Sequence, residues 1–137
     1  MNAEELMTPD PMTVDAHARV RDALQILQTL EIRHLPVVGD GNSLIGMVSD
    51  RDLRSAKIPY TLPIERMGTI RELDEPITAI MSSDVLSIGP QTEVTEIIDL
   101  MLDNKVGALP VVEDATGDLM GIVSYVDVLR RVRDAID

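Results

Sequence analysis

The chain repeats itself once, and this internal repeat constrains the fold more than any other feature of the sequence. When the sequence is shifted by 74 positions, residues 35–38 coincide with residues 109–112, both reading Leu-Pro-Val-Val. One extra residue in the second copy changes the shift to 75, and residues 44–49 then align with residues 119–124. The two alignments together hold 13 identities in 45 positions. Similarity at this level indicates two copies of one structural unit.

Each copy shows the hydrophobic patterns of the same five elements, in the order β-α-β-β-α. Apolar residues at helical spacing predict the helices, and short β-branched runs on either side of a turn predict a hairpin. The predicted segments of the first and second copy are strands 12–14 and 86–88, helices 20–30 and 94–101, strands 35–38 and 109–112, strands 44–49 and 119–124, and helices 50–56 and 125–136. The fold class that follows is α/β of the α+β kind.

The repeat divides the chain into a first domain, residues 1–58, and a second domain, residues 77–137, with a connector at residues 59–76. A unit of this size is marginal for folding alone, and two units can bury their aliphatic faces together. The connector is rich in proline and ends in an acidic run. We interpret it as an ordered crossing between the units, and a mobile linker is the alternative.

Composition excludes several classes of function. The chain is 45% hydrophobic with Tyr60 and Tyr125 as its only aromatic residues, so its core must be aliphatic. A net charge of −12 argues against partners that are nucleic acids or anionic membranes, since both attract basic proteins. The chain contains no cysteine, and no apolar run is long enough to span a membrane. We therefore expect a soluble, cytoplasmic protein.

The motifs IRHLPVV at residues 32–38 and LIGMVSDRDL at residues 44–53, with their second-copy equivalents, resemble the cystathionine β-synthase (CBS) domain. The tandem arrangement resembles a Bateman module. This resemblance implies two β-α-β-β-α units packed as a pseudo-twofold pair, with clefts between them that bind adenosine-containing ligands such as AMP, ADP, ATP or S-adenosylmethionine. It further implies a homodimer that regulates an unidentified partner protein through a conformational change.

The pattern Ser-x-x-Asp occurs where the last strand of each copy meets the last helix, as Ser49 with Asp52 and as Ser124 with Asp127. On spacing alone, the serine is a helix N-cap and the aspartate completes a capping box. A carboxylate at this position can also accept hydrogen bonds from the two hydroxyls of a ribose. The family resemblance favours the ribose-binding role for both aspartates and, with less support, for both serines.

The resemblance also assigns residues around the proline of the Leu-Pro-Val-Val run in each copy. Side chains just before this proline reach the ligand's phosphate in the family, and the adjoining backbone lines the adenine pocket. In the first copy these residues are Arg33, His34 and Pro36, and Arg51 adds a cation nearby in the sequence. A solvated surface charge is the alternative for each basic residue taken singly.

The second copy has no cation at the equivalent place, where Gly107 and Ala108 precede Leu109 and Pro110. The two sites are therefore not equivalent. Binding of a nucleoside, dependence on Arg130 or Arg131, and an empty second site all remain open.

A glycine lies inside the second hairpin strand of each copy, at Gly46 and Gly121. Glycine within a strand marks either a close approach of another backbone or tight packing of the strand against a helix. We include both glycines among the candidate ligand-binding residues.

Neither catalysis nor a resident metal is expected. The sequence contains no nucleophile elbow, P-loop or zinc signature, and neither His17 nor His34 has a second ligand at metal-binding spacing. We expect no required cofactor, and we expect Mg²⁺ only if it is bound together with a polyphosphate ligand. Two alternatives to a nucleotide sensor are a dimerising scaffold with vestigial sites and a sensor of magnesium itself.

Overall fold

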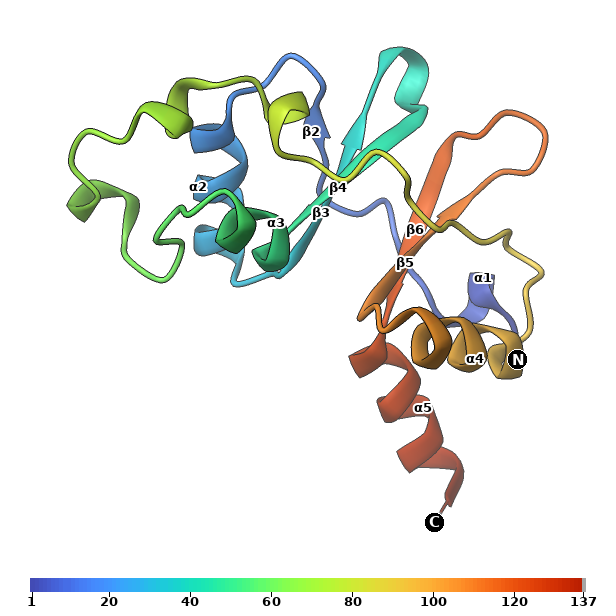
Figure 1. Ribbon diagram of the computed structural model, residues 1–137. Coiled ribbons are helices and arrows are strands. Elements are labelled where there is room, and N and C mark those ends of the chain that lie inside the picture. Colours follow the sequence, from blue (N-terminus) through green and yellow to red (C-terminus); the bar gives the residue numbers. More distant parts are fainter. Residues whose placement is uncertain (137) are drawn as a thin grey trace. The chain divides into compact units, whose positions relative to one another are not determined.

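The computed structural model describes residues 1–136 and divides into two compact units. Unit 1 contains Met1–Pro11, Gly41–Ser43 and the residues from Leu86 onward. Unit 2 contains Met12–Asp40 and Leu44–Val85. Each unit is a mixed α+β structure around one three-stranded sheet, which confirms the predicted fold class (Figure 1).

Unit 2 holds the hairpin of the first repeat. Its sheet has the order β2-β3-β4, with β2 parallel to β3 and β3 antiparallel to β4. The elements are β2 (Val14–Asp15), α2 (Val20–Leu30), β3 (His34–Val38), β4 (Leu44–Ser49) and α3 (Asp50–Ser55), and the turn η1 (Asp40–Asn42) connects β3 to β4. The predicted strand at residues 12–14 begins and ends later than expected, and the other segments lie within a residue of their predicted bounds.

Helix α2 forms because one face of it is aliphatic and can be buried. Leu24 and Leu27 are buried in a cluster with Leu35, Val48 and Leu53 of the following elements. The helix ends at Glu31, which adopts a left-handed backbone conformation with φ of 54°. This cap reverses the chain and directs it into β3.

The segment 59–76 packs onto α2 and belongs to the core of unit 2. It contains the short 3₁₀ helices η2 (Ile64–Arg66) and η3 (Arg71–Asp74), followed by η4 (Ile77–Ala79). Met67 and Leu73 are buried in the same cluster as α2. The Val20 N–H donates to Glu75 O (2.9 Å), which ties the end of the segment to the start of α2. The segment is thus an ordered part of the unit.

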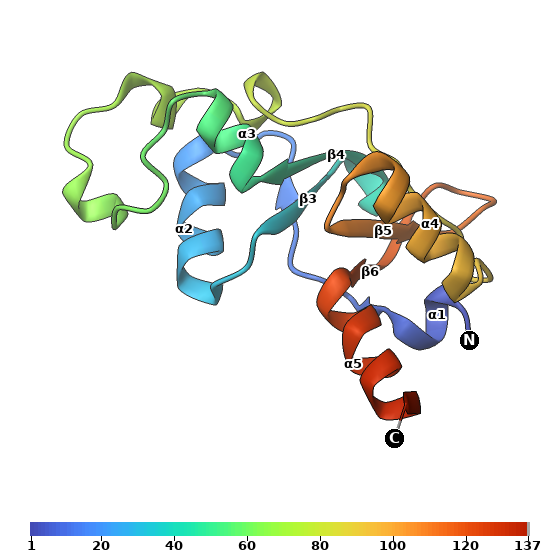
Figure 2. The ribbon, with the colours of Figure 1, turned by 60° about the horizontal axis from the view of Figure 1, so that its bottom comes forward.

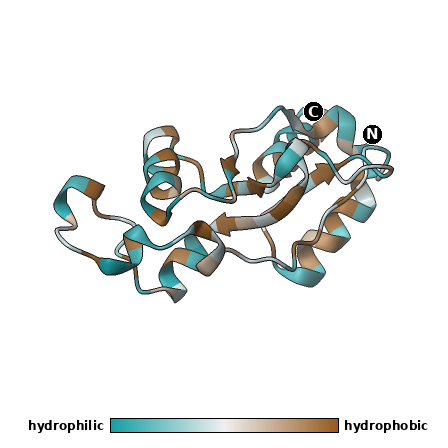
Figure 3. Cartoon of the chain, turned by 90° about the horizontal axis from the view of Figure 1, so that it is seen from above, coloured by the Kyte–Doolittle hydropathy of each residue, from teal (hydrophilic) through white to brown (hydrophobic). Residues whose placement is uncertain are grey.

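Unit 1 holds the hairpin of the second repeat, and its sheet has the order β1-β6-β5 with antiparallel pairing throughout. Its elements are α1 (Ala3–Leu6), β1 (Thr8–Pro9), α4 (Val94–Asn104), β5 (Ala108–Val112), β6 (Leu119–Ser124) and α5 (Tyr125–Ile136). In place of the predicted strand 86–88, Ile88 forms a single parallel bridge to Val111. Figure 2 shows this unit from another side, and Figure 3 shows that hydrophobic residues dominate the hairpin strands.

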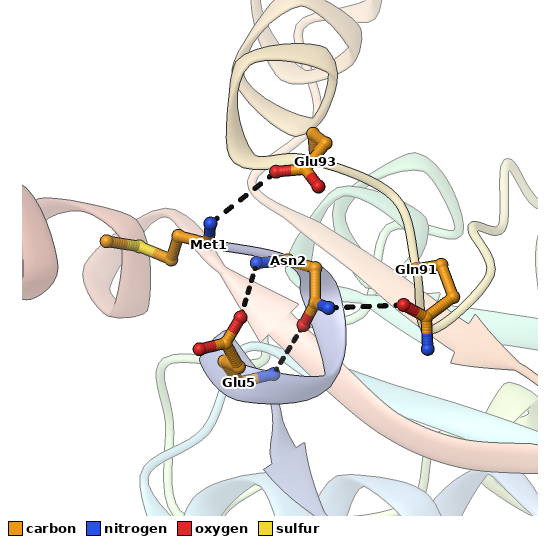
Figure 4. A network of polar contacts seen from close by, with 5 residues as sticks. All are labelled: Met1, Asn2, Glu5, Gln91 and Glu93. Carbon is orange, nitrogen blue, oxygen red and sulfur yellow. Dashed lines mark hydrogen bonds and ion pairs between the residues drawn. The ribbon is translucent and has the colours of Figure 1, made fainter.

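The first residues of the chain are fixed to the segment that precedes α4 (Figure 4). Asn2 Oδ1 accepts from the Glu5 N–H (3.1 Å), and Glu5 Oε1 accepts from the Asn2 N–H (3.1 Å), which caps α1. Asn2 Nδ2 also donates to Gln91 Oε1 (3.3 Å), and the terminal amine lies 3.5 Å from Glu93 Oε2. This helix was not predicted from the sequence.

The leading segment of each repeat pairs with the hairpin of the other repeat. Thr8 and Pro9 pair with Ile122 and Gly121 on β6. At the equivalent place in unit 2, Met47 and Ser82 exchange two hydrogen bonds, each 2.9 Å. The boundaries of the compact units therefore differ from those of the sequence repeats. The division into residues 1–58, 59–76 and 77–137 describes the repeats and stays a prediction.

Candidate functional site

The candidate site of unit 2 is centred on Asp52, in the first turn of α3. The Ser49 N–H donates to Asp52 Oδ2 (2.9 Å), and Ser49 Oγ lies 3.2 Å from the same oxygen. These contacts form the predicted capping arrangement, so the capping role is present in the structure. Asp52 is half-buried and its side chain is held in one orientation by them.

The other oxygen of the same carboxylate faces a residue that the sequence analysis missed. Ser82 Oγ donates to Asp52 Oδ1 (2.8 Å) in a solvent-exposed contact. Ser82 aligns with Thr8 in the repeat, and its backbone is bridged to Met47 of β4. The sequence did hold a signal for this position of Ser82. Met7-Thr8 and Met81-Ser82 align in the repeat, so the two segments should pair with equivalent strands, β6 and β4.

His34 lies next to Ser49 because the two residues are direct partners in the β3–β4 ladder. Burial lowers the pKa of His34 below its usual value of 6.5, and the Asp50 carboxylate offsets part of this effect. At neutral pH the imidazole is therefore uncharged, and it offers one N–H donor and one nitrogen acceptor. The structure thus brings His34, Ser49 and Asp52 together, while the expected positive charge at His34 is absent at that pH.

The remaining predicted residues of the first copy take different positions. Pro36 is buried and pairs with Met47 in the ladder. Arg51 is exposed on α3. Arg33 is exposed, directly before β3, and lines a cavity together with residues of α2 and α3.

The side chain of Met81 fills the space above Gly46. A Cβ at Gly46 would clash with Met81 and would come within 3.0 Å of Ser82 O. The close-approach interpretation of this glycine is therefore supported, and the approaching backbone is that of the chain itself.

Unit 1 repeats the same geometry with different surroundings. The Ser124 N–H donates to Asp127 Oδ2 (2.9 Å), Ser124 Oγ is 3.0 Å from that oxygen, and the Asp127 N–H donates to Ser124 Oγ (3.2 Å). Ala108, the partner of Ser124 in the ladder, replaces the histidine of unit 2. Within residues 1–136, Asp127 Oδ1 accepts no hydrogen bond, in contrast to Asp52 Oδ1.

The glycine and proline of this hairpin match their counterparts in unit 2. Pro110 is buried and pairs with Ile122. A Cβ at Gly121 would clash with the Met7 side chain and would come within 2.8 Å of Thr8 O. Both units therefore need a strand glycine beneath a methionine of the leading segment.

Two further properties concern the described part of the chain. No three acidic, histidine or cysteine side chains among residues 1–136 lie close enough together to hold a metal ion. None of the helices in this range is long and apolar enough to cross a bilayer.

Each unit carries a β-hairpin followed by a helix whose first turn holds the Ser-x-x-Asp pattern. The CBS domain model matches residues 3–58 and 77–134. The chain therefore belongs to the CBS domain family, as a tandem pair.

Three known proteins illustrate this relationship. A CBS domain-containing protein of Dictyostelium discoideum is 32% identical over 127 residues, which are 92% of this chain and 87% of that protein. AcuB from Vibrio cholerae has a similar structure, with a TM-score of 0.81, 30% identity, and coverage of 99% of this chain and 93% of that one. CBSX2, solved in complex with AMP, gives a TM-score of 0.83 at 26% identity and covers 99% and 98% of the two chains.

Some relatives are much longer enzymes. The inosine-5'-monophosphate dehydrogenase of Methanocaldococcus jannaschii is 29% identical over 129 residues, and this chain spans 23% of its length. The similarity thus concerns a module that occurs both in small proteins and within enzymes.

Proposed function

We propose that the chain is a non-catalytic sensor that binds an adenosine-containing ligand and transmits the binding to a partner protein. The observation that carries the proposal is the state of the two Ser-x-x-Asp carboxylates. In each, Oδ2 is engaged by the capping serine, while Oδ1 is bound by a single exposed hydroxyl at Asp52 and by no group of residues 1–136 at Asp127. A carboxylate oxygen accepts two hydrogen bonds, so each site keeps capacity for ribose hydroxyls.

The surroundings of each carboxylate support this role. In unit 2, the uncharged imidazole of His34 beside Ser49 can donate to an adenine nitrogen or a phosphate oxygen. The complex of CBSX2 with AMP supports an adenine nucleotide as the class of ligand. The unequal neighbours, His34 and Ala108, support unequal affinities at the two sites.

Calorimetric titration with AMP, ADP, ATP and S-adenosylmethionine tests the proposal. We expect Asp52→Ala and Asp127→Ala each to weaken binding at one site by about tenfold or more, because a charge-assisted hydrogen bond to the ribose is lost. Asp22→Ala is the matched control, since Asp22 Oδ2 accepts from the Arg19 N–H (2.9 Å) as the capping carboxylate of α2.

All three variants lose a helix cap, worth about 1 kcal/mol of folding stability, and only the two site variants should lose affinity. Equal affinities in all three variants, or no heat with any adenosine ligand on protein shown to be folded, would refute the sensor proposal and leave capping as the role of both aspartates.

A dimerising scaffold is the second candidate, and one observation favours it. Helix α5 presents an apolar stripe to solvent, formed by Tyr125, Leu129, Val132 and Ile136. These residues recur every three or four positions and so share one face of the helix. Leu129 is 59% and Ile136 is 78% exposed, which is a large apolar surface for a monomer.

Light scattering tests this candidate with one substitution on the stripe. If copies associate through α5, Leu129→Glu yields a monomer, because a charge cannot be buried there without a partner. Leu102→Glu is the matched control, since Leu102 is 69% exposed on α4 of the same unit. A monomeric unmodified protein would exclude the scaffold.

A further inference from the structure

The carboxylates of Asp52 and Asp127 differ in the number of hydrogen-bond positions that they leave open. An ionised carboxylate has about four acceptor positions, two on each oxygen. At Asp127, residues 1–136 use Oδ2 alone, through the N–H and the hydroxyl of Ser124. At Asp52, the same two groups of Ser49 use Oδ2, and the Ser82 hydroxyl takes a position on Oδ1 (2.8 Å). Within this range, Oδ1 of Asp52 therefore keeps a single open position, whereas Oδ1 of Asp127 keeps both.

The Ser82 hydroxyl is held beside Asp52 by the backbone of β4. Ser82 and Met47 exchange two backbone hydrogen bonds, each 2.9 Å. Strand β4 continues from Met47 to Ser49, where α3 begins, so the fixed Ser82 lies next to the turn that carries Asp52. The Ser82 side chain and its bond to Asp52 are exposed, so a ligand can reach this carboxylate oxygen.

Thr8 holds the equivalent position in unit 1 and provides the comparison. Thr8 pairs with Ile122 of β6, in the register that Ser82 has on β4. Within residues 1–136, the Thr8 hydroxyl makes no hydrogen bond to Asp127. Both units thus place a hydroxyl residue at the same point of the strand, and in unit 2 its hydroxyl occupies the carboxylate.

We propose that Ser82 sets the sugar specificity of the unit 2 site, an inference that rests on the proposed binding of an adenosine ligand. The two hydroxyls of a ribose both need an acceptor, and Asp52 Oδ1 has a single open position for them. A second ribose hydroxyl has to replace the Ser82 hydroxyl, so it exchanges one hydrogen bond for another of the same kind and gains little. The unit 2 site therefore binds adenosine and deoxyadenosine ligands almost equally, whereas the Asp127 site selects the intact ribose.

Calorimetric titration with AMP, 2′-deoxy-AMP and 3′-deoxy-AMP tests the proposal. The unit 2 site is measured in an Asp127→Ala background, which weakens the other site. We expect AMP to bind less than about threefold more tightly than either deoxy ligand in this background, and about tenfold or more after Ser82→Ala. The larger ratio comes from tighter binding of AMP, because the removed hydroxyl opens the second acceptor position and each deoxy ligand still uses a single one.

Three further measurements control for effects that do not involve this hydroxyl. Ser83→Ala is the matched control and should keep the low ratio, since Ser83 is the exposed serine next to Ser82. Ser82→Thr keeps a hydroxyl at the position and should also keep the low ratio. In an Asp52→Ala background, the Asp127 site should show a ratio of about tenfold or more, with or without Thr8→Ala. A purely structural effect of Ser82 would change the affinities of all three nucleotides alike and leave their ratio unchanged.

The outcomes separate this inference from the proposed function. If AMP binds and Ser82→Ala leaves the ratio unchanged, the inference is overturned and the sensor proposal stands. Weaker AMP binding by Ser82→Ala would also overturn it, because Ser82 would then be a ligand contact. A low ratio at the Asp127 site would do the same, since open acceptor positions would then not select the ribose. If no variant binds any of the three nucleotides although it is folded, the proposed function fails and this inference fails with it.

Discussion

Single glycines determine where the leading segments of this chain can lie. At Gly46 the missing Cβ leaves room for Met81, and at Gly121 it leaves room for Met7. In both units the leading segment also places a carbonyl oxygen over the strand, that of Ser82 or Thr8. A substitution by alanine would therefore push against the backbone as well as against a flexible methionine.

Gly46→Ala should destabilise unit 2 by about 1–3 kcal/mol, because the added methyl group overfills the space beneath Met81 and Ser82. Chemical denaturation of the variant and the unmodified protein measures this difference. Adding Met81→Ala to the variant should recover part of the loss, since the side-chain clash disappears and the backbone contact stays. A loss below about 0.5 kcal/mol, typical of surface substitutions, would contradict the close approach.

The half-buried imidazole of His34 should make folding stability depend on pH. Burial lowers its pKa in the folded protein below the usual 6.5, so the unfolded chain binds more protons just below pH 6.5. The stabilising contribution is complete above pH 6.5 and is lost as the pH falls through the lowered folded-state pKa. His34→Gln should flatten the profile of the free energy of unfolding below pH 6.5.

His17→Gln is the control for this pH effect, since His17 is exposed on the same unit. Denaturation curves recorded between pH 5 and pH 8 compare the two variants with the unmodified protein. Identical slopes for the unmodified protein and His34→Gln would show that this imidazole does not couple to folding.

At the scale of elements, α2 has two roles: it packs into the core of unit 2 and it holds the loop after Tyr60. Its aliphatic face contributes Leu24 and Leu27 to the core, and its polar Gln28 holds the loop after Tyr60. The segment 59–76 is ordered for this reason, although its prolines and charges alone permit a mobile linker. Contacts with α2, which is distant in sequence, thus make segment 59–76 an ordered part of unit 2.

Gln28→Ala should release that loop. The substitution removes three hydrogen bonds, one exposed and two part-buried, and a typical intramolecular hydrogen bond contributes about 0.5–1.5 kcal/mol net. Hydrogen exchange should show faster exchange of the Ile64 amide. Gln25→Ala, at an exposed position of the same helix, should leave this amide unchanged. Similar exchange rates in both variants would mean that the loop is held by its apolar contacts alone.

At the scale of the whole molecule, each compact unit needs a segment from the other repeat. Unit 2 extends through Met81 and Ser82, and unit 1 begins with α1 and β1 at the start of the chain. A fragment cut at the repeat boundary would therefore lack β1 in unit 1, or the bridge between Met47 and Ser82 in unit 2.

Two fragments of nearly equal length test this exchange. Residues 12–85 contain all of unit 2, whereas residues 1–76 carry α1 and β1 without their partner β6 and lack η4, Met81 and Ser82. We expect the 12–85 fragment to be the more stable, because it keeps buried Ile77 and the bridge between Met47 and Ser82. Thermal unfolding by circular dichroism compares them. A more stable 1–76 fragment would show that the repeat, not the compact unit, is the folding unit.

Local patterns in the sequence were sufficient for the repeated elements and for the capped Ser-x-x-Asp turns. Helix α5 and strands β4 and β6 match their predicted bounds, because hydrophobic periodicity, turn residues and caps act over a few neighbouring positions. The Ser-x-x-Asp spacing and the family resemblance together pointed to His34, Ser49 and Asp52, which the ladder and the cap bring together.

Contacts between distant segments determined the features of the fold and the site that local patterns did not predict. Neighbours far away in the chain determine four of these features. They are the pairing of β1, the bond from Ser82 to Asp52, the lowered pKa of His34 and the position of Arg33 in the lining of the cavity. Local propensity carries no information on such partners, since burial and pairing exist only once the chain has folded. The sequence by itself therefore determined the family and the elements, and tertiary structure decided the surroundings and charge of each candidate site.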